Sequence, residues 1–150
     1  MLRHAAPAAF LIACAPPPAI AVDTGGGEAP SISISYPPDG GVIALAPNCD
    51  VSFVVAVAIN NLTLAEPGGD DAAGEGHWHL TFKEDGSYVP VSSTYAEITQ
   101  SGFTPGSQLR LRAGLQTNQH ADLSEFPDWE DIVEVSLIDN ETAPCVPETI

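Results

Sequence analysis

The stretch Gly74-Glu75-Gly76-His77-Trp78-His79-Leu80-Thr81-Phe82-Lys83 decides the fold. Read as a β-strand, whose side chains alternate between two faces, it places three large apolar side chains, beginning with Trp78, on one face and the two histidines on the other. Three such side chains are enough to hold a strand against a core. His77 and His79 then lie about 6.6 Å apart along the backbone, so both imidazoles can reach one metal ion.

The rest of the composition favours an all-β protein. Val, Ile and Ala are frequent and are interrupted by 13 Gly and 14 Pro, whereas Met, a good helix former, occurs once. Alternating apolar segments between turn-forming residues predict about seven short strands in residues 31–138. This pattern, with a Trp on the third major strand, predicts an immunoglobulin-like antiparallel β-sandwich.

Two details of the strand arrangement can also be predicted. Residues 50–59 are apolar on both faces, which is typical of a central strand. Asp85-Gly86 is a strong signal for a two-residue hairpin loop, which would place Leu80 opposite Val91. Pro90 then falls on the returning strand, which should be an edge strand because proline lacks the backbone donor.

The charge balance excludes some partners. The chain has 20 acidic and 4 basic residues and a formal net charge of −16. Such a protein repels nucleic acid and anionic lipid headgroups, so neither is expected as a partner. The acidity fits solubility outside the cell, or attraction of cations.

The first residues predict export. Residues 1–13 combine a short basic region with a short apolar one, too short to span a membrane, and Leu11-Ile12-Ala13-Cys14 resembles the lipobox of bacterial lipoproteins, in which the cysteine carries the lipid. A rival cut after Ala21 fits ordinary secretion. Residues 14–30 read as a Pro/Gly-rich tether and residues 139–150 as a tail. We expect a location in the bacterial cell envelope (outer membrane or periplasm, through the lipid alone) or secretion.

Two cysteines remain when Cys14 is set aside for lipid. Cys49 and Cys145 form an even pair in an exported chain, and in a sandwich of this kind both positions lie at the same end. A disulfide is therefore expected. Two free thiols able to bind a metal are the alternative.

The third histidine of the mature chain completes a candidate metal site. The strand starting at His77 is expected to pair antiparallel with residues 109–115, so His120 should lie beside His77 and His79. Neutral imidazoles bind Cu or Zn, and three of them leave a coordination position open. The candidates for a further ligand or a hydrogen-bond acceptor are Glu75, Asp122 and Glu125. In the alternative interpretation, His77 and His79 only bond to loop carboxylates such as those of Asp70 and Asp71.

Several short motifs carry a resemblance. Pro38-Asp39-Gly40-Gly41, Gly76-His77-Trp78-His79-Leu80, Thr104-Pro105-Gly106-Ser107-Gln108-Leu109 and Asn118-Gln119-His120 follow one another in this order. The order resembles a group of bacterial exported immunoglobulin-like domains of unknown function, over residues 31–138. Their shared marks are a Gly-His-x-His strand, a Pro-Gly-x-x-Leu turn and a later Asn/Asp-x-His. The resemblance implies metal binding by the histidines and no activity.

Two other classes of function compete with metal binding. An enzyme needs an activated nucleophile or an acid–base pair, and no such motif is present, so we expect no catalytic residues. The alternative is a metallohydrolase or a superoxide-reactive copper centre, because an open metal site can generate hydroxide. An adhesion or assembly module of the cell envelope, with no metal, is the main alternative, in which Phe126 and Trp129 would be contact residues. The sequence does not identify a protein partner or the metal.

Overall fold

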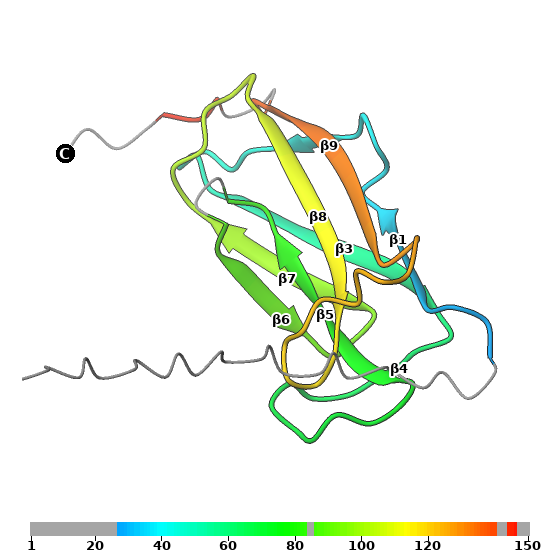
Figure 1. Cartoon of the computed structure of the whole chain (residues 1–150). Helices are drawn as coiled ribbons and strands as arrows, with labels where there is room; N and C mark the ends of the chain where they lie inside the picture. Colours follow the sequence, from blue (N-terminus) through cyan, green and yellow to red (C-terminus); the bar gives the residue numbers. More distant parts are fainter. Residues whose placement is uncertain (1–26, 84–85, 141–143, 147–150) are drawn as a thin grey trace, which may run out of the picture.

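The computed structural model describes residues 27–83, 86–140 and 144–146, and in them the chain is all-β. The strands pack as two sheets, one of three strands and one of six (Figure 1). They are β1 (Ser31–Tyr36), β2 (Val42–Ala44), β3 (Val51–Asn60), β4 (Thr63–Leu64), β5 (Glu75–Thr81), β6 (Tyr88–Val91), β7 (Tyr95–Gln100), β8 (Gln108–Gln116) and β9 (Glu130–Ile138). Among the described residues, no helix is long and apolar enough to cross a membrane.

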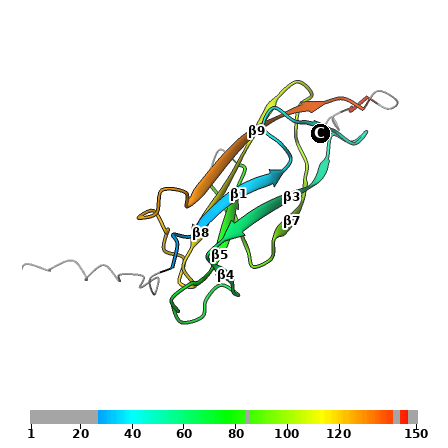
Figure 2. The same ribbon diagram turned by 90° about the vertical axis from the view of Figure 1, so that its right-hand side faces the viewer.

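The strand order confirms the predicted sandwich. The small sheet has the order β1-β3-β7 and the large one β2-β9-β8-β5-β4, with β6 also paired to β5. In the immunoglobulin nomenclature, β1, β3 and β7 are strands A, B and E, and they face β9, β8 and β5, which are strands G, F and C. The chain crosses from the small sheet to the large one between β1 and β2. The two layers are seen edge-on in Figure 2. β3 is central in its sheet, as predicted, although Val54 on its outer face is 37% exposed.

The apolar side chains that alternate along each strand pack between the two sheets and form the core. On β5, Trp78 and Leu80 are fully buried, while the indole nitrogen of Trp78 donates to the Ser93 carbonyl at 2.7 Å. On β8, Leu111 and Leu115 are also fully buried. The face of β5 predicted to be internal is therefore internal, and the histidines lie on the opposite face of the large sheet.

The predicted hairpin register is wrong by two residues. Leu80 lies opposite Val89, not Val91, and the Gly86 amide donates to the Lys83 carbonyl. The turn therefore begins one residue earlier than the Asp-Gly pair indicates. A shift of two residues keeps every side chain on its face, which is why the core prediction survives the error. Among the described strands β6 pairs with β5 alone, so the edge position predicted from Pro90 is confirmed.

A disulfide joins Cys49, before β3, to Cys145, after β9. This confirms the predicted pairing and is typical of an oxidising, exported environment. The signal peptide (1–13), the lipidation site Cys14 and most of the tether and tail fall outside the described residues, so they stay predictions.

Candidate metal centre

β5 carries two of the three histidines, and a glycine fixes where it lies. Gly76 pairs with Leu64 of β4 and lies against the end of β8, where a Cβ atom on residue 76 would be 2.2 Å from the carbonyl oxygen of Gln116. Only glycine permits this approach without displacement of one strand. It brings His77 directly opposite Gln116 and His79 opposite Gly114.

His120 comes from a tight turn immediately after β8. The Thr117 amide donates to the Ala121 carbonyl at 2.8 Å, and the His120 amide donates to the Thr117 carbonyl at 3.0 Å. His120 has a φ of 63°, a left-handed conformation that closes a three-residue loop. Histidine is tolerated there better than most residues, at a cost of about 1 kcal/mol. This conformation turns the ring back toward β5.

The acidic loop, residues 66–74, holds that turn in place. The Gly68 amide donates to the Asn118 carbonyl at 2.7 Å. The Asn118 side chain donates to the Asp70 carbonyl, and the Gln119 amide to the Asp71 carboxylate at 3.0 Å. These two aspartates therefore bind the loop that carries His120. The alternative in which they bond to His77 and His79 is not what the structure shows.

The three histidine rings converge on one another. His77 Nε2 lies 3.0 Å from His79 Nε2 and 3.3 Å from His120 Nδ1, and the third side of the triangle, from His79 Nε2 to His120 Nδ1, is 2.9 Å. The ring of His77 is fully buried, that of His79 half-buried and that of His120 exposed. The convergence predicted from antiparallel pairing is thus observed, over 41 residues between His79 and His120.

The triangle has the dimensions of a metal site. Three nitrogens bound at 2.0 to 2.1 Å to one ion, at angles of about 90° to 110°, lie about 2.9 to 3.4 Å apart. All three observed separations fall in this range. Hydrogen bonds alone cannot satisfy all three contacts, because each ring nitrogen has a single in-plane lone pair or a single proton. One cation at the centre would satisfy all three lone pairs together.

The electrostatic setting keeps the rings of His77 and His79 neutral. Burial lowers the pKa of His79 to about 4, with a smaller contribution from the charges of His77 and His120 and an opposing one from Asp122. Burial, and then the charge of His120, also lowers the pKa of His77. Since a metal must displace a proton from a protonated imidazole, rings that are already neutral at pH 7 are ready to bind.

One polar atom of the site is left without a partner. His77 Nδ1 is buried and has no hydrogen-bond partner among the described residues. Metal-bound histidines usually donate this second nitrogen to a carboxylate or carbonyl, and loss of such a partner typically costs 10-fold to 100-fold in affinity. The site therefore fits a metal in its ligand geometry but lacks this support at His77.

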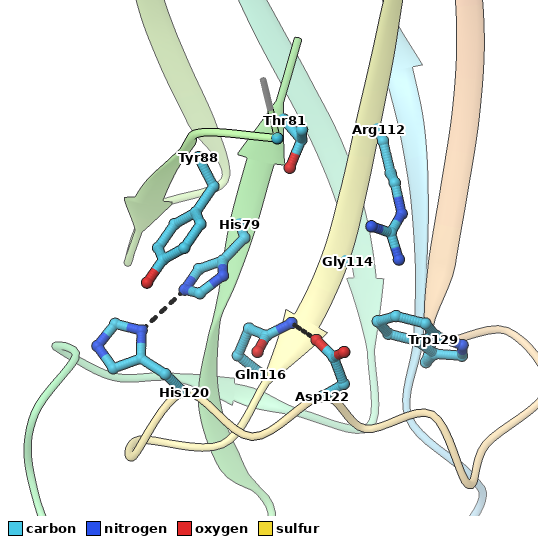
Figure 3. A pocket seen from close by; sticks show the side chains of 10 residues that line it. His79, Thr81, Tyr88, Arg112, Gly114, Gln116, His120, Asp122 and Trp129 are labelled. Atoms are coloured by element: carbon cyan, nitrogen blue, oxygen red, sulfur yellow. Dashed lines mark hydrogen bonds between the residues drawn. The ribbon is translucent and has the colours of Figure 1, made fainter. Parts of the chain in front are cut away.

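The three carboxylates expected to assist the histidines differ in position. Asp122 lines the same pocket as His79 and His120, and its carboxylate accepts a hydrogen bond from the side-chain amide of Gln116 (Figure 3). Glu75 and Glu125 are exposed. None of the three belongs to the group of ligand atoms within 4.8 Å of one another, which consists of the histidines. Asp122 is thus the one with a place beside the site.

Sequence reasoning missed two aromatic residues of the site. Tyr88 stacks on His79, with ring centroids 3.9 Å apart and planes 10° from parallel. Trp129 lies on the far side of a pocket of about 200 Å³, against Gly114 and beneath the Arg112 guanidinium (Figure 3). Side chains alternate along a strand, so Tyr88 could have been predicted to point outward. The hairpin register predicted from the sequence, however, placed Tyr88 opposite Lys83. The pocket leaves room for a few water molecules or a small ligand beside His79.

No protein-family model matches the chain, and no curated protein is significantly similar to it. The function of the site therefore has to be inferred from its geometry.

Proposed function

We propose that this protein is an exported β-sandwich domain that binds one transition-metal ion, Cu(II) or Zn(II), through His77, His79 and His120. The observation that carries the proposal is the closed triangle of ring nitrogens, with sides of 2.9 to 3.3 Å. It agrees with the separations that a shared ion imposes on imidazole ligands. The disulfide supports the exported location, and the lipobox-like Cys14 favours a lipid anchor in a bacterial cell envelope.

The choice of Cu or Zn follows from the ligands. Neutral imidazole nitrogens are preferred by these ions, whereas an all-oxygen site would favour Mg or Ca. The chain has a single methionine, Met1, so a thioether site for Cu(I) is not supported. The resemblance to exported immunoglobulin-like domains with a Gly-His-x-His strand points to the same use of the histidines.

The proposal assigns the site to binding and not to catalysis. The ring nitrogens face one another and not a nucleophile. Both cysteines of the described part are joined in the disulfide, so neither is a free thiol. A metal-free adhesion module is the function that would remain if the histidines bound no ion.

Calorimetric titration of the chelator-treated protein with Zn(II) and with Cu(II) tests the proposal. The wild type should bind one equivalent, and His120→Gly should weaken binding at least about 100-fold, because it removes one of three ligands. Glycine is chosen because it adopts the backbone conformation of residue 120 without strain, so the fold is retained.

The matched control is Asn61→Gly, a second residue with positive φ (56°) that lies outside the site. It should leave the affinity unchanged. Equal affinity of the wild type and His120→Gly would remove the proposal and leave the adhesion module as the better interpretation.

A further inference from the structure

The basic residues in the described part of this acidic protein gather in one place. Of 4 lysines and arginines, the three in the described part are Lys83, Arg110 and Arg112, and all three line one groove of about 1050 Å³. The groove lies between the end of β5, the start of β8 and the connection from β7 to β8. It is at the opposite end of the large sheet from His77.

Two of these cations have no carboxylate partner among the described residues. Arg112 forms an ion pair with Glu130. Lys83 and Arg110 are exposed, and neither forms an ion pair with a described residue, although Arg110 lies across from Glu134 on β9. The groove thus offers two exposed positive charges within a surface that is otherwise strongly negative.

The groove also contains an unpaired length of strand. β8 is paired with β9 from Gln108 to Gly114, but with β5 only from Arg112 to Gln116. Within the described residues, positions 108–111 of β8 therefore have a strand neighbour on one side only. Four residues span about 13 Å, enough for a short extended segment to add as a further strand.

Phe82 and Phe103 complete the groove with partly buried rings that also pack against the core. In a strand added beside β8, alternate side chains point toward opposite faces of the sheet. One set could then contact these rings while the other meets the cations. We propose that the groove binds an extended acidic peptide segment of a partner protein, which adds as a strand to residues 108–111 and places carboxylates beside Arg110 and Lys83.

The test is a titration of the full protein with a synthetic ten-residue peptide of alternating glutamate and valine, followed by NMR. The amide signals of Gln108 and Arg110 should shift and become protected from hydrogen exchange, because carbonyl groups of the added strand would accept hydrogen bonds from these two amides. Arg110→Gln and Lys83→Gln should each weaken binding several-fold. Glu134→Gln should strengthen it, since it removes the negative charge opposite Arg110.

Two further probes distinguish strand addition from simple attraction between opposite charges. A matched peptide with lysine in place of glutamate should not bind. Polygalacturonate carries carboxylates but no backbone amides, so equal binding of this polymer, or binding of the peptide that Arg110→Gln leaves unchanged, would overturn strand addition. His120→Gly should bind the peptide as the wild type does, which keeps the result independent of the metal proposal.

Discussion

At the scale of the residue, the site depends on the state of three imidazoles. His79 stacks on Tyr88, and each of its ring contacts with the other histidines would become repulsive if two rings were charged. The burial that lowers the pKa of His79 to about 4 therefore also keeps the triangle together. The protein holds His77 and His79 in their metal-binding protonation state before any ion arrives.

This pKa predicts how the stability of the metal-free protein depends on pH. Above pH 6.5, the ordinary pKa of histidine, His79 is neutral in both the folded and the unfolded chain. Between pH 6.5 and about 4 the unfolded chain takes up a proton that folded His79 does not, so the free energy of unfolding falls. Below about pH 4 this residue adds no further loss, and His77 acts in the same direction.

Urea unfolding of the metal-free protein at several values between pH 7.5 and 4 measures this effect. The many carboxylates titrate in the lower part of this window, so the comparison is with His79→Gln, which should lose less stability from pH 7 to pH 5. Parallel curves for the two proteins would contradict the assigned pKa.

The conformations and contacts of single residues were the features that the sequence predicted least well. The three histidines could be predicted as neighbours because strand pairing alone brings them together. The left-handed conformation of His120 could not, because position 120 is neither glycine nor asparagine, and the hydrogen bonds to residues 68, 70 and 71 that hold the turn are long-range. The stacking of Tyr88 depends on a register that the Asp-Gly signal set wrongly.

At the scale of the element, the start of β5 is the critical segment. Gly76→Ala would put a methyl group 2.2 Å from the Gln116 carbonyl oxygen, so β5 and β8 must separate. We expect a loss of about 1 to 3 kcal/mol in the free energy of unfolding, as for other overpacked sites, together with weaker metal binding as His77 is displaced. Denaturant unfolding and metal titration of the variant measure both effects.

Gly69→Ala is the control for this variant. Gly69 lies in the acidic loop with open space around its Cα and no positive φ, so alanine should be neutral or slightly stabilising there. If Gly76→Ala were as stable as Gly69→Ala, the close approach of β5 and β8 would not be the reason for glycine at position 76.

The elements themselves were largely predictable. The alternation of apolar residues predicted which faces of β5 and β8 are internal. Apolar residues on both faces predicted that β3 is a central strand. The shortest strand, β4, was not predicted as a separate sheet member because it has two residues and depends on tertiary pairing with β5. Local periodicity cannot report such pairings.

At the scale of the whole molecule, the disulfide links the segment before β3 to the segment after β9, residues 96 apart in sequence. Closing so long a loop removes unfolded-chain entropy worth up to about 4 to 5 kcal/mol. The double variant Cys49→Ala/Cys145→Ala should therefore unfold at a clearly lower denaturant concentration. Wild-type protein kept in reductant should behave like the variant, and an unchanged midpoint in both would show that the bond contributes little.

The most direct test of the central claim is X-ray absorption spectroscopy of the protein loaded with one equivalent of Zn(II). We predict three nitrogen neighbours at about 2.0 to 2.1 Å with the outer scattering typical of imidazole, falling to two in His120→Gly. A first shell of oxygen atoms that His120→Gly leaves unchanged would mean that the ion binds the acidic surface, and would contradict a metal centre made by His77, His79 and His120.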